Sequence, residues 1–249
     1  MLYYFYTLTE GLNLNSCYYE TLEKNFNEAV ALCESDFTHE ELINMLENGN
    51  IPQKQIAALK LTEIKNATEA NILLSNLTGQ DGKIREAVSL RLAEFMNNPT
   101  MAVYFQSVNN YDIFLDAVVD INANICRNVI SAISSLKNNM EFTSYFCAHL
   151  SKMIFELIDK IEQFDVRDGK YKVNKELFKL YWCLECVYEF YEYFDINTLK
   201  SILKRTQYAD EYTIREKTAK ILSRNIKDSE LDLIKAKLKQ DSNYYVKKY

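Results

Sequence analysis

Glycine and proline are scarce in this sequence, since 249 residues contain five glycines and two prolines. Chains built from β-strands need many turn residues, so this scarcity indicates an all-α protein. Long apolar runs are also missing: no stretch of about 18 apolar residues occurs, and no membrane-spanning helix is expected. Residues 1–6 contain no basic residue and form too short an apolar run for a signal peptide, so we expect a cytoplasmic protein.

Recognisable catalytic patterns are absent from the sequence as well. It has two histidines and six cysteines, but no Gly-rich phosphate loop, no HExxH and no EF-hand spacing. Cys183 and Cys186 form a CxxC pattern, yet they lie in the middle of a predicted helix, where cysteine packs as a small apolar side chain. We therefore expect no catalytic residue, no metal site and no cofactor.

Positive charge is rare at the start of the chain and common at its end. Residues 1–50 carry one lysine and nine acids, whereas residues 201–249 carry twelve basic and seven acidic residues, and the whole chain has a net charge of −6. Solvated helix faces are the ordinary explanation. The alternative is two differently charged ends that steer partners or favour head-to-tail contact. The overall acidity makes nucleic-acid binding unlikely, because phosphate affinity needs clustered Lys and Arg.

A repeating pattern is the most informative feature that the sequence does contain. In the segment from Asp81 to Met96, Ile84, Val88, Leu92 and Phe95 are spaced to lie on one face of a helix. Measured from Arg85, small or apolar residues follow after three, four, seven and ten positions. The same template starts again at three other positions and opens a further time near the end of the chain: Lys54, Cys126, Arg215 and Val246–Lys247.

Another amphipathic segment precedes each template helix, so the repeating unit is helix, turn, helix. One such pair cannot bury its apolar faces alone, so neighbouring pairs must stack. We predict a single all-α domain over residues 1–249, an α-solenoid of about six antiparallel helix pairs. Its predicted parts are an N-terminal cap (1–37), regular repeats (38–137), an irregular long helix pair (138–195) and C-terminal repeats of which the last is incomplete (196–249).

This pattern resembles the HEAT repeat family, including the short HEAT-like repeats of phycobilisome lyases. The similarity is carried by Asp81, Ile84–Arg85, Val88, Leu92 and Phe95, and by their echoes at Ile214–Arg215, Leu222 and Val246–Lys247. It covers residues 38–137 and 196–249. HEAT proteins are mostly scaffolds and adaptors, so the resemblance implies a fold and only weakly a function.

The resemblance also implies roles for two sets of residues. An arginine at the template position commonly bonds an acid at a neighbouring turn, so Arg85 and Arg215 are expected to form a structural ladder with acids such as Asp81. The exposed positions of the second helices line the concave face in this family. The candidates there for partner binding are Lys60, Arg91, Lys220 and Arg224.

The most unusual composition is the aromatic segment of residues 178–194, FKLYWCLECVYEFYEYF. As a helix it is apolar on two faces, so burial between neighbouring repeats is the ordinary expectation. If one face stays exposed, Phe178, Trp182 and Tyr193 are the natural anchors for a partner, because aromatic residues dominate such contacts.

The sequence favours a non-catalytic scaffold or adaptor that binds another protein. One alternative is an enzyme on the same scaffold, either similar to a bilin lyase, which needs a bilin pocket, or a DNA-repair glycosylase of the HEAT type. The glycosylase needs a basic, aromatic groove and a catalytic acid. A third possibility is self-association, since residues 246–249 begin a helix that cannot be completed within the sequence.

Overall fold

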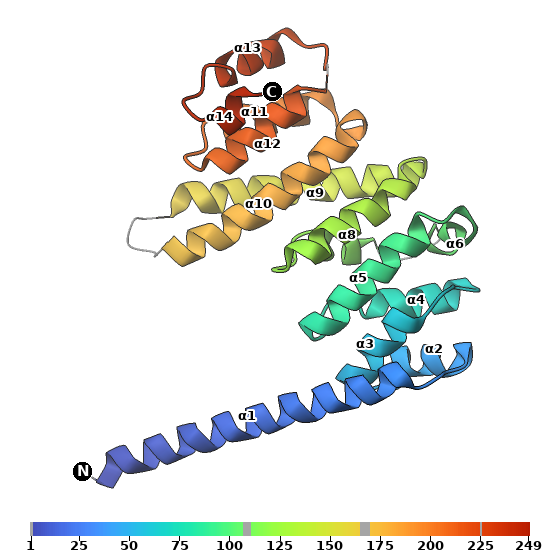
Figure 1. Ribbon diagram of the computed structural model, residues 1–249. Coiled ribbons are helices and arrows are strands. Elements are labelled where there is room, and N and C mark those ends of the chain that lie inside the picture. The colour runs from blue at the N-terminus through green and yellow to red at the C-terminus, as the bar shows by residue number, and fades with distance from the viewer. Residues whose placement is uncertain (1, 107–110, 165–169, 225) are drawn as a thin grey trace. The chain divides into compact units, whose positions relative to one another are not determined.

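The computed structural model describes residues 2–106, 111–164, 170–224 and 226–249 (Figure 1). Every regular element within these ranges is a helix, which confirms the all-α prediction. The chain separates into two compact units, Met1–Leu92 and Ala93–Tyr249, and each is described by itself. The prediction of one continuous domain stays a prediction.

The first unit contains four helices and the start of a fifth: α1 (Leu2–Glu34), α2 (His39–Asn48), α3 (Ile51–Lys60), α4 (Ala67–Ser75) and α5 (Gly82–Met96). Local sequence signals define where they begin. Thr38 and Asn50 each form a capping box, with Glu41 and Gln53 respectively, and Pro52 lies in the first turn of α3. Helix α3 packs against both α1 and α2, and α2 also packs against α4.

The template positions form the core of this unit. Ala57, Leu61, Val88 and Leu92 are completely buried, because residues three and four apart share the helix face that neighbouring helices cover. Buried Asn76 is fully used, since its amide donates to the Leu46 carbonyl at 3.0 Å and its oxygen accepts from Lys54 at 2.9 Å.

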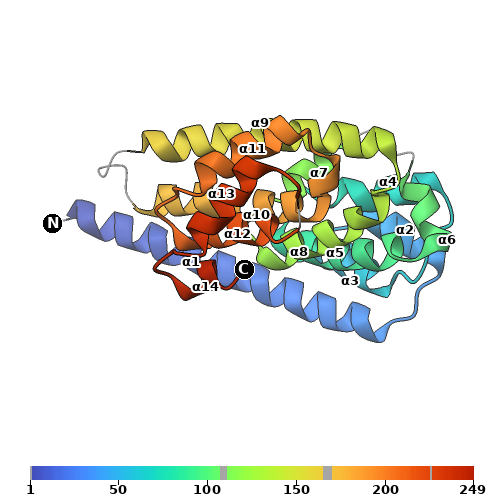
Figure 2. The same ribbon diagram turned by 90° about the horizontal axis from the view of Figure 1, so that it is seen from above.

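The second unit continues the helical pairs. Its elements are α6 (Pro99–Ala102), η1 (Val103–Phe105), α7 (Asp112–Ala117), α8 (Ala123–Ile133), η2 (Ser134–Leu136), α9 (Met140–Gln163), α10 (Lys170–Phe190), η4 (Tyr191–Tyr193), α11 (Ile196–Thr206), α12 (Tyr212–Leu222), α13 (Ser229–Leu238) and α14 (Tyr244–Lys247). Helices α7, α9, α11 and α13 pack in that order, and α10, α12 and α14 form a second row beside them (Figure 2). Two rows of helices stacked in chain order are the arrangement of an α-helical repeat fold.

The predicted long pair is α9 and α10. Helix α9 has 24 residues, about 36 Å at 1.5 Å per residue. Phe142 and Phe146 of α9 and Phe190 of α10 are completely buried, and their rings lie 5.2–6.1 Å apart. The turn predicted around Asp168–Gly169 lies outside the described residues. Helix α10 begins at Lys170, about five residues before the predicted start.

The predicted N-terminal cap corresponds to α1, which packs against α3. Its apolar stripe is only partly covered, since the side chains of Leu22, Phe26 and Val30 are 37%, 63% and 43% exposed. None of residues 18–34 is buried. Phe26 and Val30 border an open groove between α1 and α3, so the contact with α3 leaves this stripe accessible.

Candidate functional site

Helices α10 and α12 together form the most chemically distinctive surface of the second unit. We call it the α10–α12 surface; it comprises Tyr181, Trp182, Glu185, Tyr188, Lys217, Lys220 and Arg224. Residues three or four apart share a helix face, so the polar members of each helix point toward the other helix. The two helices pack directly against each other along this line.

One carboxylate of this surface is shared by two lysines. Oε1 of Glu185 accepts from Lys220 Nζ at 2.7 Å, and Oε2 accepts from Lys217. Burial alone would raise the pKa of Glu185, but hydrogen bonds from Lys217 and Lys220 outweigh it and lower that pKa. Burial also opposes the charge on Lys217, and its hydrogen bonds to Glu185 and Tyr181 leave its pKa raised. Glu185 and Lys217 are therefore both charged at neutral pH.

Cations of this surface also lie over tyrosine rings. Lys217 Nζ lies 4.2 Å from the centroid of Tyr181, and Lys220 Nζ lies 4.0 Å from that of Tyr188. The guanidinium carbon of Arg224 lies 3.8 Å from the Tyr188 centroid, and the Arg224 Nε is buried with no hydrogen-bond partner among the described residues. Cation–π contacts hold the three cations in place. Lys217 and Lys220 share the single carboxylate of Glu185, while Glu189, which borders the same hollow, bonds Lys137 at 3.1 Å.

Two hollows flank the Tyr181–Trp182 pair. One has a volume of about 540 Å³ and is bordered by Arg127, Ile130 and Lys217; the other, of about 570 Å³, is bordered by Phe178, Glu211 and Thr213. Tyr181 and Trp182 border both. Concave sites of this size that combine aromatic walls with a few polar groups are typical of ligand and peptide binding.

The aromatic anchors occupy different environments. Trp182 is only 7% exposed, and its indole Nε1 is buried without a hydrogen-bond partner. Trp182 therefore does not protrude, because α10 packs against both α9 and α12, and its role in partner binding stays a prediction. Phe178 is half-buried beside Trp182, with the ring centroids 6.2 Å apart.

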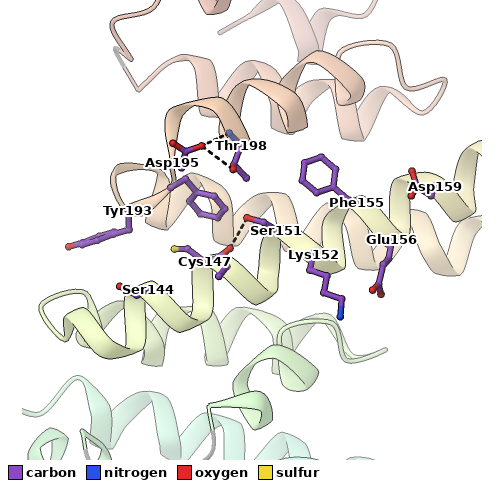
Figure 3. Close-up of a pocket in the computed structure, with 12 residues that line it drawn as sticks. Ser144, Cys147, Ser151, Lys152, Phe155, Glu156, Asp159, Tyr193, Asp195 and Thr198 are labelled. Atoms are coloured by element: carbon purple, nitrogen blue, oxygen red, sulfur yellow. Dashed lines mark hydrogen bonds between the residues drawn. The ribbon is translucent and has the colours of Figure 1, made fainter.

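Tyr193 lies at a separate hollow, of about 610 Å³, between α9 and α11 (Figure 3). Here the Ser151 hydroxyl donates to the Cys147 carbonyl at 2.7 Å, and Asp195 accepts from the Thr198 amide at 2.9 Å as the cap of α11. Burial raises the pKa of the Cys147 thiol to about 12, so the thiol stays protonated and is a poor nucleophile. The hollow is also lined by Lys152, Glu156 and Asp159, and its thiol is not activated.

Lys60 and Arg91, the other two predicted binding residues, belong to the first unit. Lys60 donates to the Ser35 carbonyl at 2.7 Å. Arg91 donates to the carbonyl of Ala58 at 3.2 Å and to that of Leu59. The Ala58 and Leu59 carbonyls lie at the C-terminal end of α3, where a cation is favourable. Both residues therefore have structural contacts within the first unit, and their predicted role in partner binding stays a prediction.

The predicted arginine ladder is clearest at Arg215. Its guanidinium donates to both oxygens of Asp241, at 2.7 and 3.3 Å, and to the carbonyls of Ala209 and Asp210. Asp241 lies in the turn before α14, so the ion pair joins successive repeats as expected, although through an acid that the sequence did not single out. In the first unit, Arg85 donates to the Gln80 carbonyl. Asp81 accepts from the Lys83 amide at 2.9 Å at the start of α5.

The remaining cysteines also lack reactive character. Cys183 and Cys186 are completely buried, and burial raises the pKa of both thiols. Within the described ranges, no group of three or more His, Cys, Asp or Glu is arranged to hold a metal ion. No described helix combines the length and apolar character needed to cross a membrane.

Comparison with known proteins adds little beyond the fold. No protein-family model and no curated protein matches the sequence. An engineered protein solved by the Northeast Structural Genomics Consortium is similar, with 12% identity, a TM-score of 0.46 and coverage of 84% of this chain and 92% of that one. A designed armadillo repeat protein has 12% identity, a TM-score of 0.44 and coverage of 85% and 96%. At these values the fold assignment rests on the packing of the helices within each unit.

Proposed function

We propose that this protein is a non-catalytic, cytoplasmic scaffold of the HEAT-like type. In this proposal the α10–α12 surface binds an acidic segment of another protein that carries aromatic or other apolar side chains. Repeat proteins present rigid faces built from many helices, which suits recognition of extended partners.

The observation that carries this proposal is the excess of fixed positive charge beside half-buried tyrosines. Lys217, Lys220 and Arg224 are held on tyrosine rings, and among the described residues Glu185 is the carboxylate that bonds the two lysines. Cations that are already ordered lose little side-chain entropy on binding, which increases affinity. An acidic segment would complement the charge, and its apolar side chains would fit the hollows next to Tyr181.

The enzyme alternatives have less support. A glycosylase needs a carboxylate that is free to act, whereas both oxygens of Glu185 accept hydrogen bonds from lysines. A covalent mechanism through cysteine needs a thiolate, whereas burial keeps Cys126 and Cys147 protonated by raising each pKa to about 12. The α10–α12 surface is better suited to hold a partner than to perform chemistry.

The proposal can be tested without knowing the partner. Peptides selected from a random-sequence display library against the whole chain are expected to be rich in Asp, Glu and aromatic residues. Arg224→Ala should weaken their binding about tenfold, because it removes one charge-assisted contact. Lys160→Met, at an exposed position on α9, is the matched control and should leave binding unchanged. Selected peptides without acidic residues, or binding that Arg224→Ala does not alter, would contradict the proposal.

A further inference from the structure

Helix α1 has an apolar face that its contact with α3 leaves largely exposed at the side chains described from residue 18 onward. Tyr19, Leu22, Phe26 and Val30 follow one another after three or four residues, so they share one side of the helix, which we call the α1 face. Tyr19 and Phe26 are 67% and 63% exposed. Beside them, α1 and α3 enclose a groove of about 450 Å³ lined mainly by Phe26, Ala29, Val30, Ile51, Ile56 and Leu59. A contiguous apolar surface of this kind marks an interaction site.

The surroundings of the α1 face are strongly acidic. Residues 18–36 contain five acids, at positions 20, 23, 28, 34 and 36, and one lysine, so this segment has a net charge of −4. None of these five carboxylates takes part in an ion pair within the described part of the chain. A partner must therefore bring both apolar side chains and positive charge.

The opposite end of the sequence has that chemistry. Tyr212, Tyr244 and Tyr245 are 38%, 67% and 53% exposed. The Tyr245 ring centroid lies 6.3 Å from that of Tyr212 and 5.8 Å from that of Tyr244. We call these three residues, with Lys247 and Lys248, the α14 face.

The charge around the α14 face is the inverse of that around α1. Residues 235–249 contain five lysines and one acid, a net charge of +4. The single acid, Asp241, is already bonded to Arg215, and Lys248 bonds Glu216 of α12 at 2.9 Å. The two segments therefore have net charges of opposite sign, and each carries exposed aromatic residues.

We propose that the partner of the α1 face is a second copy of this chain, which binds through its α14 face. Helix α1 packs against α3, and α14 packs against α12. Both α3 and α12 are second helices of their pairs, so seating α14 of one copy beside α1 of another extends the same kind of helix row. The contact joins two different surfaces and is therefore heterologous, which generates head-to-tail chains or closed rings. The α14 face shares no residue with the α10–α12 surface.

Two single substitutions test this contact. Phe26→Asp places a charge in the α1 face, and Tyr245→Asp places one in the α14 face. Sedimentation velocity of the wild type across a concentration series should show association that weakens as salt is added. Each variant alone should be monomeric, because every contact needs one intact α1 face and one intact α14 face. An equimolar mixture of the two variants should form a 1:1 dimer and nothing larger.

The outcomes separate the possible partners of α1. Ile121→Asp, at a position 77% exposed and outside both faces, should associate as the wild type does, and circular dichroism should show unchanged helix content in all variants. If Tyr245→Asp alone still associates, two α1 faces pair with each other and the proposal is wrong. A wild type that stays monomeric at every concentration, or a mixture that stays monomeric, overturns it equally.

Discussion

Helices α1 and α10 are both long and aromatic, but they are packed in opposite ways. In α10, Leu184, Cys186 and Phe190 are completely buried because α9 covers one side and α12 the other. In α1, no side chain between residues 18 and 34 is buried. Apolar periodicity thus identifies the face of a helix that avoids water, but a neighbour of sufficient length decides whether that face is covered within the chain.

The largest difference between the two helices should appear on truncation of phenylalanine. Phe190→Ala removes a completely buried ring that packs against Phe142 and Phe146, so it should lower the free energy of unfolding by about 3–5 kcal/mol. The same change at Phe26 should alter it by no more than roughly 0.5 kcal/mol. Denaturant titration at low protein concentration measures both. Equal losses would contradict the contrast between α10 and α1.

Removal of a charged contact between α10 and α12 should lower the stability by a smaller amount, and this loss depends on pH. Lys217→Met leaves Glu185 partly buried and bonded to one cation instead of two. The substitution should therefore lower the free energy of unfolding by about 1–3 kcal/mol at pH 7. The pKa of Glu185 is lowered in the folded protein; its contribution is therefore present above the ordinary glutamate value of 4.5 and is lost as the pH falls below it. The pKa of Lys217 is raised, so its contribution is lost only at strongly alkaline pH.

Chemical denaturation of the wild type and of Lys217→Met between pH 3 and pH 7 tests this pH dependence. The difference in the free energy of unfolding between the two proteins should become smaller as the pH falls. A difference that stays constant down to pH 3 would show that Glu185 is not held by Lys217. Lys160→Met, exposed on α9, controls for the loss of one positive charge.

A smaller effect still is expected at the ladder between repeats. Arg215→Ala removes the paired contact with Asp241 and two carbonyl contacts, which should cost roughly 1–2 kcal/mol. Arg205 bonds Asp159 and Glu162, which are more than half exposed, so Arg205→Ala should cost less than about 1 kcal/mol. Thermal unfolding of the two variants compares them, and a larger loss for Arg205→Ala would reverse the assignment of Arg215 as the structural residue.

Much of this fold could be predicted because the signal is local. A spacing of three or four residues selects one face of a helix, and the template positions Leu61, Val88 and Ile214 are indeed completely buried. The start of α2 at Thr38 followed from its capping box for the same reason.

The pairing across helices could not be predicted in the same way. Glu185 and Lys217 lie 32 residues apart and Arg215 and Asp241 lie 26 apart, and whether they meet depends on the packing of whole helices. His39 at the start of α2 is likewise partly buried and bonds Glu69 of α4 at 3.0 Å. The exposure of Phe26 also has no signal in its own helix, because it depends on how α3 packs against α1.

The most direct test compares the environments of the two helices with tryptophan, because Trp182 is the only tryptophan in the chain. Acrylamide quenching is measured for the wild type and for the double variant Phe26→Trp, Trp182→Phe at low protein concentration. Trp182 in α10 should be protected, and the tryptophan at position 26 in α1 should be quenched readily and become protected only as the concentration rises. Strong quenching of Trp182, or protection at position 26 that does not depend on concentration, would contradict the account.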